Sequence, residues 1–131
     1  MPVDAATRRL VRQRAGNRCE HCQSHQDTLP LITFHIEHVI AKQHGGTDEE
    51  SNLCLACHWC NFHKGTNLAT RVHGVLVPLF HPRMQNWDEH FVLSGNRIVG
   101  LTAVGRGTAK LFNMNDDDRC KLRSSELPRQ S

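Results

Sequence analysis

The stretches that organise this chain are Cys19-Glu20-His21-Cys22 and Cys57-His58-Trp59-Cys60. Each is a Cys-x-x-Cys hook with two sulfur ligands, and two hooks complete a tetrahedral zinc site with no open position. Because residues 23–56 separate the hooks, one ion would clamp distant parts of the chain together. We therefore predict a structural Zn²⁺ ion bound by Cys19, Cys22, Cys57 and Cys60.

Two other uses of paired cysteines compete with zinc. Disulfides persist in oxidising compartments and are rare where thiols stay reduced. A thiol redox protein needs one hook inside a βαβ pattern, and neither hook here has that surrounding. Zinc therefore remains the favoured interpretation.

The composition of the 131-residue chain agrees with a domain stapled by metal. Apolar residues make up 38% of it, with five Phe, two Trp and no Tyr, so apolar burial alone gives a thin core. A net charge of +3 permits a polyanionic partner without identifying one. No apolar run approaches the roughly 18 residues that cross a bilayer, and the arginine-rich N-terminus lacks a signal-peptide core. We expect a cytoplasmic protein with no membrane partner and with reduced thiols.

Short helices and short strands alternate along the chain, which predicts an α+β fold. Asp4 is a good N-cap for a helix over residues 4–15. The β-branched run at 31–40 and residues 52–56 are typical of strands, and a short helix is expected at 57–64.

Beyond residue 70 the patterns are weaker. Pro78 and Pro82 predict an edge or irregular segment over residues 75–80. Further elements are predicted as a hairpin (91–93 with 97–101) and two helices (102–114 and 116–127). We expect a core at residues 1–70 and a C-terminal extension at 71–131, packed together as one compact domain.

Three motifs are arranged around the hooks. Between the hooks lie Phe34-His35-Ile36-Glu37-His38-Val39-Ile40, then Gly45-Gly46 and Ser51-Asn52-Leu53. The second hook runs directly into Asn61-Phe62-His63-Lys64-Gly65. Asn52 follows His38 by 14 positions, and Asn61 follows Asn52 by 9.

This order of motifs resembles the HNH nucleases, small bacterial and phage-like members included. The resemblance implies a ββα-metal core of two strands and a helix, stapled by structural zinc. It also implies an N-terminal helix and a C-terminal extension built from a hairpin plus helices. The expected activity is metal-dependent endonuclease cleavage of phosphodiester bonds in nucleic acid, with double-stranded DNA as the expected substrate.

The resemblance implies catalytic roles for two residues. His38 would be the general base that deprotonates water, since a histidine is neutral over part of the physiological pH range. Asn52 would tie the intervening loop together and orient His38.

Four residues are candidate ligands of the catalytic cation. By their motif positions, Glu37 and Asn61 would bind it through oxygen atoms, which favours Mg²⁺ or Mn²⁺. His35 and His63 are additional candidates.

Lys42 and Lys64 flank these motifs and are candidate contacts for phosphate groups. The alternative function is a zinc-stabilised nucleic-acid-binding module that has lost catalysis. Such a module has no use for a histidine beside a carboxylate, so the sequence favours the enzyme.

Overall fold

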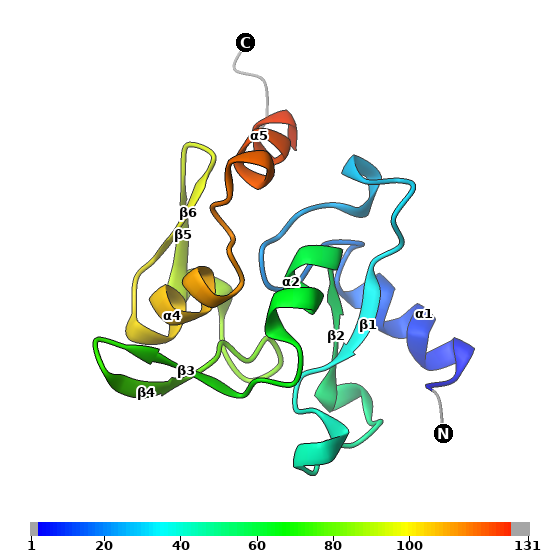
Figure 1. Ribbon diagram of the computed structural model, residues 1–131. Helices are drawn as coiled ribbons and strands as arrows, with labels where there is room; N and C mark the ends of the chain where they lie inside the picture. The colour runs from blue at the N-terminus through cyan, green and yellow to red at the C-terminus, as the bar shows by residue number, and fades with distance from the viewer. Residues whose placement is uncertain (1–2, 127–131) are drawn as a thin grey trace.

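In a computed structural model of the protein, which describes residues 3–126, an antiparallel strand pair lies between two helices (Figure 1). The strands are β1 (His35–His38) and β2 (Leu53–Ala56), paired in regular register from His35 opposite Ala56 to His38 opposite Leu53. α1 (Ala5–Arg14) and α2 (His58–Lys64) flank the pair. This mixed arrangement confirms the predicted α+β class.

α1 begins and ends where local chemistry predicts. The Asp4 side chain accepts a hydrogen bond from the backbone N–H of Thr7 at 2.8 Å, which satisfies a free donor of the first turn. Gly16 and Asn17 then adopt positive φ angles of 62° and 58°, which stops the helix. The helix buries Val11 and delivers the chain to the first cysteine hook.

The predicted strand over residues 31–40 is shorter in the structure, because a side chain captures its first part. Gln26 follows the first hook in the short helix η1 (Gln26–Thr28). Its amide accepts from the N–H of Phe34 and donates to the carbonyls of Leu29 and Ile32. These bonds hold residues 29–34 in a turn, so strand pairing begins only at His35.

A compact loop connects β1 to β2 and includes η2 (Lys42–His44) and η3 (Glu50–Asn52). The buried Asn52 side chain holds it closed. Its Oδ1 accepts from the N–H of Ile40, and its Nδ2 donates to the carbonyls of Ile40 and Thr47, each at 2.9 Å. A Cβ on Gly46 would meet the Ile40 carbonyl oxygen at 1.7 Å, so the closed loop requires glycine there.

The later elements are β3 (Ala69–Val72), β4 (Val75–Pro78), α3 (Trp87–His90), β5 (Phe91–Ser94), β6 (Arg97–Gly100), α4 (Ala103–Leu111) and α5 (Asp117–Glu126). The predicted hairpin near residues 91–101 is confirmed as β5–β6. Residues 75–80 were expected to be irregular or an edge, and β4 forms a two-stranded hairpin with β3 that the sequence did not predict. Pro78 ends that strand, where its missing N–H costs little. The predicted helices are α4 and α5, and Leu127 lies outside the described residues.

One apolar core joins the two parts of the chain. Phe34, Leu53 and Leu55 pack in the same cluster as Phe91 and Phe112. This core contains residues from both sides of the predicted boundary at residue 70, and the boundary itself stays a prediction.

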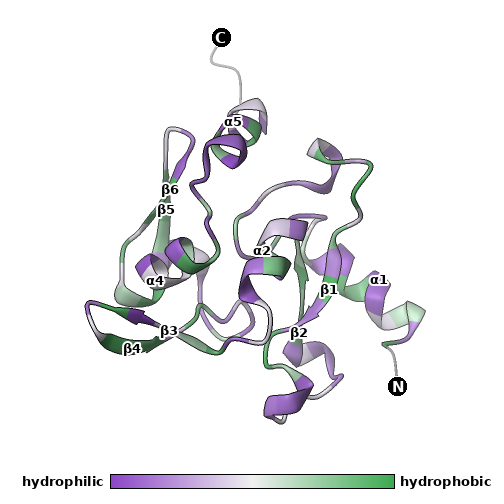
Figure 2. Ribbon diagram, in the orientation of Figure 1, coloured by the Kyte–Doolittle hydropathy of each residue, from purple (hydrophilic) through white to green (hydrophobic). Residues whose placement is uncertain are grey.

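Figure 2 shows that β4 is apolar, yet its side chains at Val75 and Leu76 lie mostly in solvent. No helix in the described part of the chain has the length and apolar character of a membrane span.

Candidate active site and zinc site

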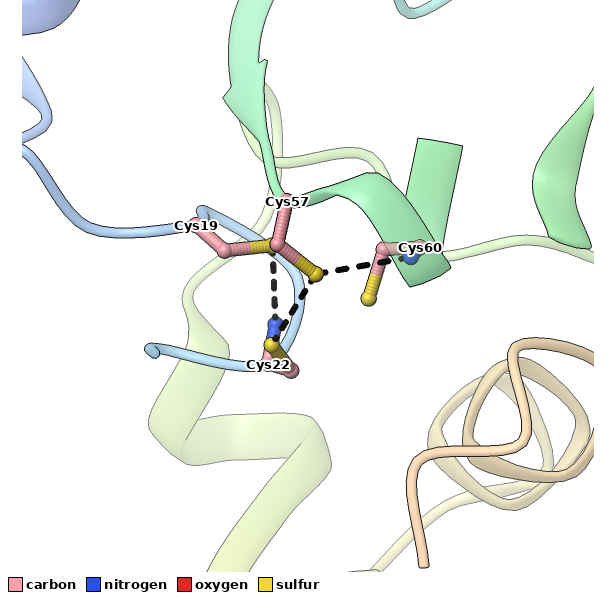
Figure 3. Close-up of side chains that lie close together, drawn as sticks. All are labelled: Cys19, Cys22, Cys57 and Cys60. Carbon is pink, nitrogen blue, oxygen red and sulfur yellow. Dashed lines mark hydrogen bonds between the residues drawn. The ribbon is translucent and has the colours of Figure 1, made fainter. Parts of the chain in front are cut away.

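The two cysteine hooks meet at one point (Figure 3). Cys19 and Cys22 lie in the turn after α1, where the backbone of Glu20 pairs with Leu55 in β2. Cys57 is the N-cap of α2, and Cys60 lies in its first turn. All four sulfur atoms lie within 4.8 Å of one another, and all four residues are buried.

The cluster fits a structural zinc ion. A tetrahedral site with Zn–S bonds of about 2.3 Å requires sulfur atoms about 3.8 Å apart. The Cys22 and Cys57 sulfurs are 3.7 Å apart, which is far too long for a disulfide and suits two ligands of one ion. Burial raises the pKa of the Cys19 and Cys60 thiols, so a cation is needed to hold these two residues as thiolates.

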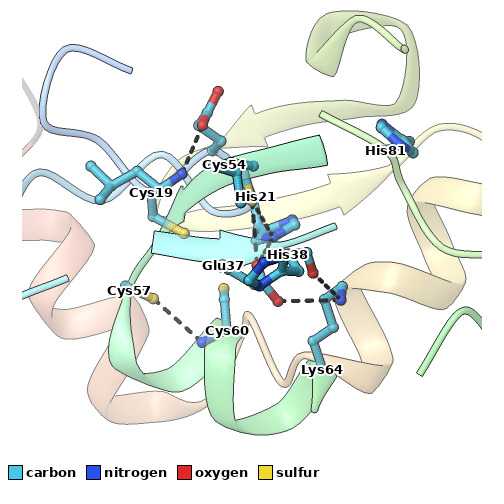
Figure 4. A network of polar contacts seen from close by, with 12 residues as sticks. Cys19, His21, Glu37, His38, Cys54, Cys57, Cys60, Lys64 and His81 are labelled. Atoms are coloured by element: carbon cyan, nitrogen blue, oxygen red, sulfur yellow. Dashed lines mark hydrogen bonds and ion pairs between the residues drawn. The ribbon is translucent and has the colours of Figure 1, made fainter. Parts of the chain in front are cut away.

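Glu37 lies on the buried face of β1, directly opposite Cys54 of β2 (Figure 4). One carboxylate oxygen contacts His21 Nε2 at 2.8 Å and accepts from Cys54 Sγ at 3.3 Å. The other lies 3.3 Å from Lys64 Nζ, which also donates to the His38 carbonyl. Burial alone would raise the pKa of Glu37, but the charges of His21 and Lys64 outweigh it and lower that pKa.

His38 points away from this buried network. Successive side chains of a regular strand face opposite sides, and β1 has no bulge between Glu37 and His38. His38 Nε2 lies 2.7 Å from Asp48 Oδ1, and the other Asp48 oxygen accepts from Lys42 Nζ at 2.9 Å. The His38 side chain is 26% exposed, so a substrate can reach it. Hydrogen bonds from Lys42 and His38 lower the pKa of Asp48.

Three of the four predicted cation ligands, Glu37, His35 and His63, are not gathered at one point. Glu37 is engaged in the buried network, and a divalent ion there would lie beside the Lys64 ammonium. Two groups of side chains within residues 3–126 could hold a metal ion: the four cysteines, and Glu37 with His21 and Cys54. His35 and His63 belong to neither group. His35 is exposed near His58, and His63 packs against Phe62. Glu37, His35 and His63 therefore do not form a preassembled cation site together, and all four ligand assignments, Asn61 included, stay predictions.

The two lysines predicted to contact phosphate differ in the structure. Lys42 is half-exposed beside Asp48, so a phosphate can approach it. The Lys64 side chain is only 2% exposed and is paired with Glu37. Its ammonium contacts this buried carboxylate, and its role as a phosphate contact stays a prediction.

Sequence patterns did not single out three side chains that complete these networks. His21 sits inside the first hook and looked incidental there, and Cys54 looked like a plain core residue. Asp48 lies in the polar loop among other acidic residues. One feature of the sequence could have pointed to Asp48 as a partner of His38: it lies between the Gly45-Gly46 pair and Asn52, ten positions after the predicted base. Only the folded loop brings it within reach of His38.

Residues 19–67 match the family model of the HNH endonuclease. The match covers both hooks, the strand pair and α2, which is the region whose motifs carry the resemblance. An HNH match suggests a nuclease or nucleic-acid-binding role. No curated protein and no solved structure matches the chain.

Replacing Cys57 with serine should abolish zinc binding and unfold the protein. Structural zinc supplies an apparent binding energy of about 10–16 kcal/mol, which equals or exceeds the about 5–15 kcal/mol that holds a typical domain folded. Zinc content by mass spectrometry and far-ultraviolet circular dichroism measure the two effects. Cys120→Ser is the control, because Cys120 is buried but lies outside the cluster. A folded Cys57→Ser protein with a full equivalent of zinc would contradict the zinc assignment.

Proposed function

We propose that this protein is a metal-dependent endonuclease that hydrolyses phosphodiester bonds in DNA, with His38 as the general base. The observation that carries the proposal is the 2.7 Å contact between His38 and Asp48, at a solvent-accessible position within the HNH match. A base held by a carboxylate is the arrangement that general-base catalysis needs. Because reduced cysteines persist in the cytoplasm, we place the activity there.

The contact with Asp48 selects the histidine tautomer. The Asp48 carboxylate is ionised, so it accepts a hydrogen bond and cannot donate one. Nε2 of His38 therefore carries the hydrogen, and Nδ1 keeps its lone pair for a proton from water. As the water oxygen attacks phosphorus, Nδ1 takes the proton and the bond from phosphorus to the leaving oxygen breaks. Asp48 then stabilises the imidazolium that has formed.

A divalent cation, Mg²⁺ or Mn²⁺, would neutralise charge on the phosphate and on the leaving oxygen. HNH nucleases generally use a divalent metal, and Glu37 and Asn61 remain its predicted ligands. Because the Glu37 carboxylate is paired with Lys64, no catalytic step is assigned to the cation here.

A groove beside His38 offers a path for the phosphate backbone. Its volume is about 390 Å³, and its lining includes Arg8 and Arg12 of α1 together with His35 and His38 of β1. None of the described lining residues is a carboxylate. Positive side chains along a groove bind phosphates without reading sequence, which suits a double-stranded DNA substrate.

A second candidate function is a nucleic-acid-binding module without catalysis. The observation that favours it is the burial of Glu37, whose oxygens contact Lys64 and His21 instead of open solvent. A binding module would keep the zinc cluster and the basic groove while having no need for His38. The next experiment separates the two functions.

The first experiment is plasmid nicking by the wild type and by His38→Ala, with Mg²⁺, with Mn²⁺ and with no added divalent ion. We expect nicking only with a divalent ion, and a loss of about 10²–10⁴-fold in His38→Ala. His44→Ala is the control, since His44 is an exposed histidine of the loop that follows β1. A wild type that binds DNA and zinc but never cuts would replace the nuclease with the binding module.

Asp48→Asn should reduce cleavage by at least about 10²-fold, because an asparagine amide can donate to Nε2 and move the histidine hydrogen to Nδ1. The lone pair that accepts the water proton is then lost. Single-turnover cleavage rates measure this effect. Glu49→Gln neutralises the neighbouring exposed carboxylate and should leave the rate unchanged. Equal rates for Asp48→Asn and Glu49→Gln would remove Asp48 from the proposal.

Arg8→Gln should weaken DNA binding and reduce the salt dependence of that binding. Each phosphate contact contributes a slope of about 0.9 to the plot of log affinity against log salt. Fluorescence anisotropy with labelled duplex at several salt concentrations measures it. Lys121→Gln is the matched control, because Lys121 is an exposed cation on α5 and does not line the groove. Identical slopes for the two variants would exclude Arg8 from the phosphate path.

A further inference from the structure

Arg119 of α5 connects the C-terminal helix to the cysteine cluster. Only 3% of the Arg119 surface is exposed to solvent. Its Nη2 donates to Cys60 Sγ at 3.0 Å and lies 3.8 Å from Cys57 Sγ. The guanidinium carbon lies 5.5 Å from the ring centre of Trp59, in the same hook. Nη1 donates to the carbonyl of Phe112, so the planar group is held from several directions.

The charge of the cluster explains why a guanidinium belongs there. Four thiolates and one Zn²⁺ ion leave two negative charges, and the cluster is buried, where uncompensated charge is costly. Backbone N–H groups supply weaker donors, from Cys22 to Cys19 Sγ at 3.5 Å and from Cys60 to Cys57 Sγ at 3.4 Å. Among the hydrogen bonds of residues 3–126, only Arg119 brings a cation to these sulfurs.

We propose that Arg119 is a positioning residue of the zinc site, which neutralises part of the thiolate charge and slows loss of the ion. A charged N–H donor lowers the energy of the sulfur lone pairs, because it attracts their electrons. The sulfur ligands then give up the zinc ion less readily to protons or to other electrophiles that compete for the same lone pairs. This inference concerns the zinc site and does not depend on the proposed nuclease activity.

The same contact makes the C-terminal helix part of the zinc site. At its other end, α5 is held by Glu126, whose Oε1 accepts from the N–H of His25 and from Thr28 Oγ1, both at 2.6 Å. His25 and Thr28 follow the first hook, whereas Arg119 contacts the second. α5 therefore spans from one hook region to the other.

The test compares Arg119→Met and Arg123→Met with the wild type, using the full chain. Arg123 is the matched control, because it is a buried arginine on the same helix that donates to the carbonyls of Asn96 and Met114 and contacts none of the four clustered sulfurs. Zinc release to the chelator 4-(2-pyridylazo)resorcinol is followed by absorbance. We expect release at least about 10-fold faster in Arg119→Met than in Arg123→Met.

A spectrum separates an effect on sulfur from a general loss of stability. In protein loaded with Co²⁺, the sulfur-to-cobalt charge-transfer band should move to lower energy in Arg119→Met and stay in place in Arg123→Met, because only the first loses a donor to sulfur. Equal release rates or an unshifted band would overturn the proposal.

Arg119→Gln removes the positive charge while keeping a polar side chain, and it provides the same two measurements if Arg119→Met does not fold. Zinc release faster than the wild type, with a band shift, then supports the proposal. Wild-type release and an unshifted band overturn it.

Discussion

The convergence of four buried cysteine sulfurs fixes how α1 and α2 meet the strand pair β1–β2. The first hook follows α1 and pairs with β2 through the backbone of Glu20, while the second hook forms the first turn of α2. One ion bound at this point would tie both helices to the strand pair between them. A core with few aromatic residues would gain from such a tie, because a metal adds folding energy that apolar burial does not supply. Arg119 extends the same constraint to α5, so the C-terminal part of the chain rests on the zinc site as well.

A second buried group determines which face of β1 carries chemistry. Glu37 is held inside by three side chains: Oε2 contacts His21 and accepts from Cys54, and Oε1 pairs with the Lys64 ammonium. Strand geometry then places the neighbouring His38 on the other face, where Asp48 meets it. Removing one partner from a buried ion pair is costly, so the Glu37–Lys64 pair also resists rearrangement of the strand. The proposed active site is therefore a consequence of a buried charge pair that takes no part in the proposed proton transfer.

The loop between the strands supplies the remaining part of the site. Asn52 binds Ile40 on both of its backbone groups and reaches Thr47, so one side chain closes the loop. Gly46 permits the close approach that this requires. Asp48 and Lys42 lie in the closed loop, and their positions relative to His38 depend on it. The proposed base, His38, thus lies on a paired strand. Asp48, which orients it, lies in a loop that the Asn52 side chain holds closed.

The sequence by itself determined the zinc hooks, the HNH motifs and the limits of α1, β2, α2 and the β5–β6 hairpin. These features depend on neighbours within a few residues, on caps, turns and periodicity, which a local pattern records. Only the tertiary structure decided that Lys64 is buried against Glu37, that Asp48 meets His38, and that Arg119 reaches Cys60. Each of these contacts joins side chains whose proximity no local pattern specifies, and Arg119 lies 59 positions from Cys60. Gln26 shows the same limit, because its bonds across a turn ended a strand that residue preferences alone would have extended to Leu31.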